Sequence, residues 1–197
     1  NKQMTTGEGG MILTNRDDVA ALCRSMRNQG RDEGQGWLEH ARLGFNYRLS
    51  DIHCALGLAQ LSRIEEILDK RVAVADLYRE QLGHLTDLLL PVGPRQGRLS
   101  WFVYVVRLAD RFTRADRDRI LLALRDNGIG CNSYFAPIHL QPFYVEQFGF
   151  KPGDFPVTEH ISDRTIALPF FTTMTSDQVS QVADCLTQVM ATTEAFR

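Results

Sequence analysis

The feature of this sequence that most limits its possible folds is a long helical pattern in the second quarter of the chain. From Asp51 to about Leu82, apolar residues recur at three- and four-residue spacing, starting with Ile52 and Leu56, which is the periodicity of one face of an α-helix. Ser50 stands directly before the pattern and can cap its N-terminus. Because average helices have only about 11 residues, so long a pattern predicts one continuous helix that connects two domains.

Two elements are predicted before this helix. Residues 9–15 are apolar in the middle and begin with glycines, a composition typical of a strand. Residues 16–28 carry apolar side chains at helical spacing and are followed by Gly30, a residue type that commonly ends helices. The polar, glycine-rich stretch at 29–42 then predicts a long loop, and loops of this length tend to be functional or mobile.

The part of the chain after the long helix predicts a small α+β domain. Residues 100–108 are apolar on both faces, so we expect them to form a central strand. Thr113 and Asp116 approximate a capping box and predict the start of a helix. We also expect a strand at 129–135, a short helix at 160–166, and a last helix that begins at Thr175 and Gln178.

Composition excludes several classes of protein. The chain has 197 residues, of which 44% are hydrophobic and 23% are charged, and these are ordinary values for a globular protein. A net charge of −2 and a pI near 6.2 predict no basic surface for nucleic acid or for an anionic membrane. We find no apolar run long enough to span a bilayer and no signal peptide. We therefore expect a cytoplasmic protein.

Several chemically reactive residues are expected to have no functional role. The four cysteines lie far apart and form no Cys-x-x-Cys pair, a spacing that predicts no metal site. Cys54 and Cys185 fall within helical apolar patterns, so we interpret them as buried, reduced thiols. Asp154 and Glu159 are interpreted as solvated charges.

A lysine at the start of the chain has more specific chemistry. Lys2 lies in a polar, glycine-rich segment that ends at Gly10. Lysine can form a Schiff base with an aldehyde cofactor if its amine is uncharged near neutral pH. On local chemistry alone, however, such a segment is more typical of an ordinary turn that carries a solvated lysine.

Three stretches together resemble the DegT/StrS family of nucleotide-sugar aminotransferases. Asn1 to Met11, with the sequence NKQMTTGEGGM, is similar to the cofactor-lysine motif of the family, Lys-x-(Ile/Leu/Met)-Thr-Thr-Gly-Glu-Gly-Gly. The stretches 44–51 (GFNYRLSD) and 139–142 (HLQP) match later family segments in the same order. The resemblance implies an α/β, aspartate aminotransferase-like fold (PLP fold type I). Residues 1–58 would complete the PLP-binding large domain, and residues 59–197 would form the small α+β domain, including the connecting helix.

The resemblance also implies roles for individual residues. Lys2 would bind pyridoxal 5′-phosphate (PLP) and then transfer a proton during catalysis. Asn46 would reach the PLP phosphate of a neighbouring subunit, which implies a homodimer with shared active sites. Arg48, Tyr134 and His139 would contact the substrate. A structural ion pair for Arg48 and a hydrogen-bonded structural role for His139 are the alternatives.

The implied reaction is the transamination of a keto-sugar nucleotide, with glutamate as the expected amino donor, in polysaccharide or secondary-metabolite biosynthesis. Family dehydratases have histidine in place of the lysine, so Lys2 favours transamination over sugar dehydration. The other alternative is a PLP-fold regulatory protein or a fragment without catalysis. Family members are about twice as long and carry most cofactor ligands in their N-terminal half. We therefore expect this chain to be a C-terminal half that is inactive alone.

Overall fold

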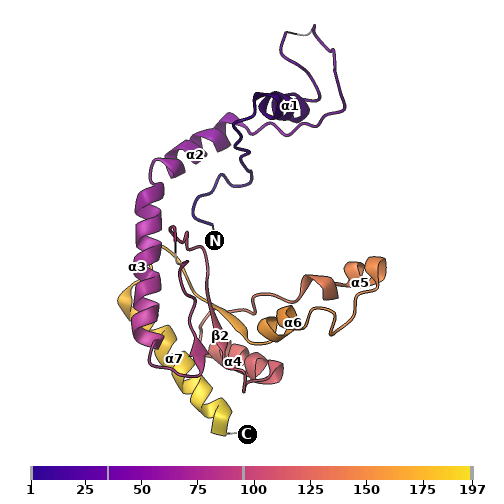
Figure 1. Cartoon of the computed structure of the whole chain (residues 1–197). Helices are drawn as coiled ribbons and strands as arrows, with labels where there is room; N and C mark the ends of the chain where they lie inside the picture. The colour runs from indigo at the N-terminus through magenta and orange to yellow at the C-terminus, as the bar shows by residue number, and fades with distance from the viewer. Residues whose placement is uncertain (1, 35, 95, 196–197) are drawn as a thin grey trace. The chain divides into compact units, whose positions relative to one another are not determined.

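The computed structural model describes residues 2–34, 36–94 and 96–195, and these form two compact units (Figure 1). The first unit comprises Lys2–Ile64, and the second comprises the described residues from Glu65 onward. The assignment of residues 1–58 to a PLP-binding large domain stays a prediction.

The first unit contains two helices, α1 (Asp17–Arg27) and α2 (Asp51–Leu61), separated by a long loop. Helix α1 confirms the prediction for residues 16–28. Helix α2 begins as expected after Ser50, whose hydroxyl oxygen accepts a hydrogen bond from the His53 N–H at 3.4 Å. A side-chain cap of this kind satisfies one of the backbone donors that a helix leaves unpaired at its start.

The predicted strand at residues 9–15 is wrong, because this segment has no regular secondary structure. The side chains of Met11, Ile12 and Leu13 are 79%, 70% and 88% exposed. A strand requires a neighbour that pairs with its backbone N–H and C=O groups. Among the described residues, the strands belong to one sheet in the second unit. The apolar pattern thus marks a segment suited to a sheet, but no strand lies beside it among the described residues of the first unit.

The prediction of one continuous helix from 51 to 82 is also wrong. Helix α2 ends at Leu61, and α3 (Ile64–Leu82) begins after two intervening residues, Ser62 and Arg63. The Arg63 N–H donates to the Gln60 carbonyl at 3.1 Å. The two residues are three positions apart, as in a 3₁₀ turn, which is tighter than an α-helical turn. The Ser62 hydroxyl donates to the Ala59 carbonyl at 3.0 Å. Serine side chains compete with the backbone in this way and weaken helix interiors.

A three-stranded antiparallel sheet is the centre of the second unit. Its strands are β1 (Leu88–Leu89), β2 (Tyr104–Leu108) and β3 (Thr165–Leu168), in the order β1-β2-β3. Every second side chain of β2 is fully buried, and these are Tyr104, Val106 and Leu108. The expectation of a central strand at 100–108 is therefore confirmed for its second half.

Two predictions around this sheet are wrong. The segment 129–135 makes only a single bridge to the sheet, between Asn132 and Ala167. At the residue after this bridge, the Ser133 N–H donates to the Asn132 side-chain oxygen at 2.9 Å and not to β3. The backbone pairing with β3 therefore ends at Asn132. The helix expected at 160–166 is α6 (Pro156–Ser162), and the residues from Thr165 onward belong to β3.

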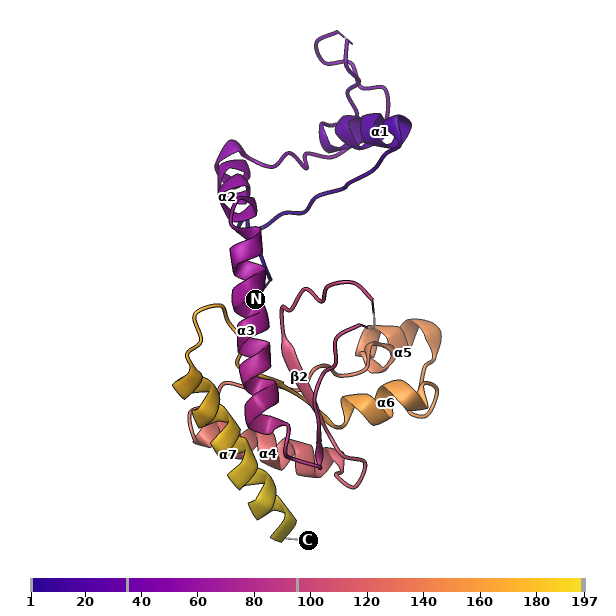
Figure 2. The ribbon, with the colours of Figure 1, turned by 60° about the vertical axis from the view of Figure 1, so that its left-hand side comes forward.

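Helices α3, α4 (Arg114–Asp126) and α7 (Ser176–Ala195) pack with the sheet around one core, and α4 and α7 lie against each other (Figure 2). The 3₁₀ turn η1 (Ile138–Leu140), α5 (Pro142–Phe148) and α6 form a separate group between α4 and β3 in the chain. The largest fully buried side chains come from all parts of this core: Tyr78, Leu82, Tyr104, Leu108, Phe112, Ile120, Leu124, Ile166 and Leu186.

Both predicted helix caps in the second unit are confirmed. The Thr113 hydroxyl oxygen accepts from the Asp116 N–H at 3.2 Å, and the Asp116 carboxylate accepts from the Thr113 N–H at 2.8 Å. Thr175 and Gln178 form the same reciprocal pair at the start of α7, at 3.3 and 3.0 Å. These caps require only residues three positions apart, so the sequence predicts them directly.

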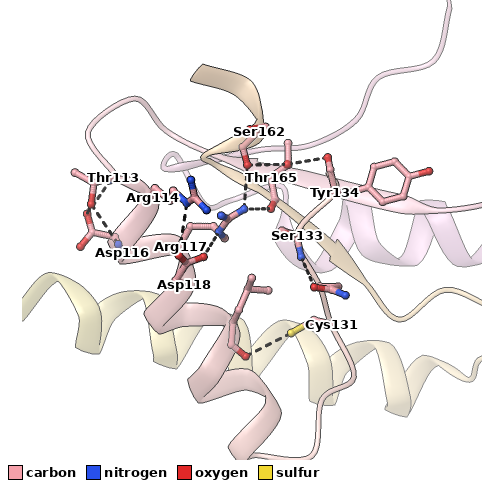
Figure 3. A network of polar contacts seen from close by, with 12 residues as sticks. Thr113, Arg114, Asp116, Arg117, Asp118, Cys131, Ser133, Tyr134, Ser162 and Thr165 are labelled. Atoms are coloured by element: carbon pink, nitrogen blue, oxygen red, sulfur yellow. Dashed lines mark hydrogen bonds and ion pairs between the residues drawn. The ribbon is translucent and has the colours of Figure 1, made fainter. Parts of the chain in front are cut away.

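A buried arginine joins α4 to the segment between α6 and β3 (Figure 3). The Arg117 guanidinium donates to the carbonyl oxygens of Ser162 at 2.9 Å and Thr165 at 3.5 Å, and it pairs with Asp118 at 2.7 Å. Since Arg117 is only 5% exposed, these acceptors compensate for the loss of water around its charge.

None of the helices in the described residues is long and apolar enough to cross a membrane. Within the same residues, no group of three or more His, Cys, Asp or Glu side chains is placed to hold a metal ion. The four cysteines are free thiols. The expectation that Cys54 is buried is wrong, because this residue of α2 is exposed, whereas Cys185 is partly buried.

Tyr78 provides a test of the core of the second unit. Its ring stacks on that of Tyr104 at 4.7 Å, and its hydroxyl donates to the Pro169 carbonyl at 2.7 Å. We predict that Tyr78→Phe lowers the free energy of unfolding by about 1–2 kcal/mol, because the carbonyl loses its donor. Urea denaturation measures the change. Tyr47→Phe is the matched control, since Tyr47 is 71% exposed; equal losses in both variants would contradict the prediction.

Candidate functional site

The predicted site residues fall into two groups. Lys2, Asn46 and Arg48 belong to the first unit, whereas Tyr134 and His139 belong to the second. Their surroundings within each unit are defined by hydrogen bonds and close contacts, and these determine what each group can contribute chemically.

The segment that follows Lys2 is a tight turn held against α2. The Gly7 N–H donates to the Thr5 hydroxyl at 3.1 Å, and the Thr6 hydroxyl donates to the Glu8 carbonyl at 2.8 Å. The Thr5 N–H also donates to the Gln60 side chain at 3.3 Å. The turn that such a segment typically forms is therefore present, whereas the strand predicted to follow it at residues 9–15 is not.

Glycines allow this turn to approach its neighbours closely. Gly9 has a φ of +148°, and a Cβ added to it would lie 2.8 Å from the Thr6 hydroxyl oxygen and 3.1 Å from a Leu49 methyl carbon. On α2, a Cβ added to Gly57 would lie 3.0 Å from the Thr6 methyl group. A side chain at Gly9 would crowd Thr6 and Leu49, and one at Gly57 would crowd the Thr6 methyl group. Lys2 itself is exposed and directly precedes this fixed turn.

Asn46 and Arg48 lie on a segment that pairs with the end of α1. The Phe45 N–H donates to the Met26 carbonyl at 2.7 Å, and Asn46 forms an isolated antiparallel bridge with Asn28. The side chain of Asn46 is exposed and its amide is therefore available to a ligand. The Arg48 guanidinium donates to the Asn28 side-chain oxygen at 2.6 Å, a contact that holds Arg48 without neutralising its charge.

The loop between α1 and this segment is closed at its base. A Cβ added to Gly30, whose φ is +77°, would lie 1.8 Å from the Arg42 carbonyl oxygen, so only glycine fits there. The Arg42 guanidinium also donates to both carboxylate oxygens of Asp32, with Nη2 lying 2.9 Å from Oδ2. It donates to the Ser25 hydroxyl as well. The hydrogen bonds from Arg42 and then Ser25 hold the pKa of Asp32 below its ordinary value, which keeps this pair charged.

His139 lies in the interior of the α5–α6 group. It is 8% exposed, and its Nε2 lies 3.0 Å from the Glu159 carboxylate. The ring also packs on Phe155 at 4.7 Å and on Phe150 at 6.2 Å between centroids. In this geometry His139 has the hydrogen-bonded surroundings of a structural histidine, and a substrate contact through it stays a prediction.

The interpretation of Glu159 as a solvated charge is wrong. Its carboxylate accepts hydrogen bonds from the Gly153 N–H at 2.9 Å and the Phe155 N–H at 3.2 Å, besides facing His139. The bond from Gly153, followed by those from His139 and Phe155, holds the pKa of Glu159 below its ordinary value. Sequence reasoning missed this role because Glu159 and His139 are twenty residues apart. Asp154 is exposed as expected.

Tyr134 lies beside the bridge to β3. Its carbonyl oxygen accepts a hydrogen bond from the Thr165 hydroxyl at 2.9 Å (Figure 3), and its ring stacks on Phe135 at 3.9 Å. The ring is partly exposed. The backbone contact fixes this segment, and a substrate contact through the side chain of Tyr134 stays a prediction.

Comparison with known proteins places the chain in a family. The family model described as the DegT/DnrJ/EryC1/StrS aminotransferase family matches residues 1–187. The chain is 35% identical to GDP-perosamine synthase from Caulobacter vibrioides over 191 residues, and 29% identical to the spore coat polysaccharide biosynthesis protein SpsC from Bacillus subtilis over 199 residues. Each match covers 96% of this chain but only 50% and 51% of the relative.

Solved structures agree with this result. The aminotransferase PseC from Helicobacter pylori superposes with a TM-score of 0.88 at 24% identity, over 97% of this chain and 51% of that one, and shows the fold. DesI, solved in the presence of its TDP-sugar product, superposes with a TM-score of 0.82 at 27% identity, over 99% and 49%. The chain spans about half the length of the proteins it matches. With the family model covering 187 of its residues, this chain belongs to the DegT/DnrJ/EryC1/StrS aminotransferase family.

Proposed function

We propose that this chain is part of a PLP-dependent aminotransferase that converts a keto-sugar nucleotide into an amino-sugar nucleotide. The observation that carries the proposal is the position of Lys2, an exposed lysine beside a turn that hydrogen bonds and close glycine contacts fix on α2. GDP-perosamine synthase, at 35% identity, supports a sugar nucleotide as the substrate class. The expected pathway is cell-surface polysaccharide or secondary-metabolite biosynthesis.

The residues of the first unit fit a PLP group. Lys2 would hold it through the side-chain amine, and the exposed amide of Asn46 would bind the phosphate of the PLP group in the neighbouring subunit. When bound, PLP supplies an electron sink for the carbon that gains or loses the amino group. The contribution of Lys2 to turnover is to carry a proton to and from that carbon, a role that requires an amine held at close range. The turn at Thr5–Gly9 would hold it there.

The remaining assignments concern the substrate and the assembly. Arg48 has a guanidinium whose charge is not neutralised by its contact with Asn28, so it suits an anionic group of the substrate. Tyr134 and His139 would border the sugar. The working unit would be a cytoplasmic homodimer in which Asn46 serves the neighbouring site, and glutamate would be the amino donor.

Labelling of Lys2 tests the cofactor assignment. We predict that borohydride reduction of the PLP-loaded protein, followed by peptide mapping, finds the phosphopyridoxyl group on Lys2. Lys2→Ala should abolish the label and, in the complete enzyme, reduce amino-sugar formation by more than about a hundredfold, because both anchoring and proton transfer are lost. Lys70→Ala is the control: this exposed lysine pairs with Glu66 on α3. A label on another lysine would contradict the assignment.

Mixing two inactive variants tests the shared site. Introduced separately into the complete enzyme, Lys2→Ala and Asn46→Ala should each abolish most of its activity. After subunit exchange, half of the dimers are hybrids and half of their sites are intact, so about a quarter of wild-type activity should return. Each variant carried through the same exchange by itself is the control. If mass spectrometry proves hybrid formation and no activity returns, Asn46 does not serve the neighbouring site.

A further inference from the structure

Glu159 connects separate parts of the group formed by η1, α5 and α6, and none of the roles proposed above uses it. Its Oε1 accepts hydrogen bonds from the N–H groups of Gly153 at 2.9 Å and Phe155 at 3.2 Å. The same oxygen lies 3.0 Å from His139 Nε2. Helices α5 and α6 lie side by side in both views of the chain (Figure 1 and Figure 2). One carboxylate therefore connects the loop between these helices to the turn that carries His139.

The charge of Glu159 determines which nitrogen of His139 carries the hydrogen. The hydrogen bond from Gly153, followed by those from His139 and Phe155, holds the pKa of Glu159 below its ordinary value, so the carboxylate is ionised near neutral pH. An ionised carboxylate can only accept hydrogen bonds. Nε2 must therefore be the donor, and in a neutral imidazole the second nitrogen, Nδ1, is then an acceptor.

Nδ1 is the open side of a ring that is otherwise enclosed. His139 is only 8% exposed, and its ring packs on those of Phe155 at 4.7 Å and Phe150 at 6.2 Å between centroids. Among the described residues, Nδ1 has no hydrogen-bond partner, yet it is not one of the buried polar atoms that lack a partner. It follows that Nδ1 reaches the surface. The packing of the phenylalanine rings opposes a rotation that would exchange the two nitrogens.

We propose that Glu159 is a positioning residue, which holds His139 so that Nδ1 accepts a hydrogen bond from a hydroxyl group of the sugar substrate. The lone pair of Nδ1 attracts a donor such as a hydroxyl and repels the oxygens of a phosphate, which are acceptors. His139 would thus recognise the sugar and not the phosphates. The ligand in this inference rests on the proposed function, whereas the effect of Glu159 on His139 is tested without it.

A purely structural role for Glu159 is the competing explanation. Its hydrogen bonds with Gly153 and Phe155 hold the loop that leads into α6, and they stabilise the fold whether or not His139 contacts a ligand. On that account, substitutions at Glu159 lower stability, and any effect on sugar binding does not pass through His139. The two explanations therefore differ in the predicted state of His139 and in how changes at the two residues combine.

¹⁵N NMR of the complete, PLP-loaded enzyme with labelled histidine measures the tautomer. The signals of His139 are those missing from His139→Gln. In the wild type near neutral pH, we expect hydrogen on Nε2 and none on Nδ1, which places the two nitrogen signals far apart. In Glu159→Ala the two signals should move toward each other, because exchange between tautomers averages them. Hydrogen on Nδ1 in the wild type, or an unchanged tautomer in Glu159→Ala, overturns the proposal.

Calorimetric titration of the same enzyme tests the ligand. The probes are amino-sugar nucleotides built on GDP, UDP and TDP, each compared with the bare nucleotide. Glu159→Ala and His139→Gln should each weaken binding of the amino-sugar nucleotide about tenfold, the effect of losing one hydrogen bond, and leave binding of the bare nucleotide unchanged. The amide N–H of His139→Gln can still donate to Glu159, but this variant has no acceptor in place of Nδ1. Glu159→Gln should recover part of the affinity, since its amide oxygen can replace Oε1.

The double variant separates the two explanations. If Glu159 acts through His139, then Glu159→Ala adds no further loss of affinity when His139→Gln is already present. A second loss of about tenfold would show that Glu159 acts independently of His139, and would overturn the proposal. Glu146→Ala is the matched control, because Glu146 is an exposed glutamate on α5 in the same group. Equal losses in Glu146→Ala and Glu159→Ala would also overturn the proposal.

Failure of this inference is distinguishable from failure of the proposed function. A wild type that binds none of the amino-sugar nucleotides contradicts the proposed function, and with it the hydroxyl ligand of His139. A wild type that binds them, but has His139 in the other tautomer or shows independent losses in the double variant, leaves the proposed function intact. That result overturns the positioning role of Glu159 alone.

Discussion

Close approach of backbone and side chains at glycine is the constraint on which the first unit depends. This unit has no sheet among its described residues, so its long segments are fixed by individual hydrogen bonds and by close contacts at glycines. Gly57 admits the Thr6 methyl group, and Gly30 admits the Arg42 carbonyl. The first contact places the Lys2 segment on α2, and the second closes the loop that ends near Asn46. The geometry around both predicted cofactor ligands therefore follows from residues that carry no chemistry.

The second unit is organised differently, by a buried apolar core and a few buried polar groups that join its parts. Tyr78 connects α3 to the segment after β3, and Arg117 connects α4 to the segment before it. Glu159 plays a similar part outside the core, since it fixes the loop at Gly153 and the ring of His139. The segment that resembles the family's sugar-binding region is thus held by one carboxylate, whose lowered pKa keeps it ionised and able to accept all of these bonds.

The accuracy of each sequence-based prediction depends on how far apart in the sequence the interacting residues lie. The cap at Thr113 and Asp116 was predictable because both partners lie within one helical turn. The strand expected at 9–15 failed because an apolar pattern reports burial tendency but not the presence of a partner strand. The break at Ser62 depends on a single hydroxyl that hydrogen-bonds the backbone. The pairs His139–Glu159 and Arg42–Asp32 join residues with no sequence periodicity between them, and only the folded chain brings them together.

The choice between arginine and lysine along the chain bears on the chemistry of the site. Only Lys2, Lys70 and Lys151 are lysines among the 22 Lys and Arg residues. Wherever a permanent charge is needed, as at Arg42 and Arg117, the residue is arginine, which stays protonated in proteins. A guanidinium cannot serve as an amine nucleophile or exchange a proton near neutral pH, whereas a lysine amine can. A lysine just before the turn that is fixed on α2 is therefore suited to covalent and proton-transfer chemistry, and the arginines are suited to permanent ion pairs and hydrogen bonds.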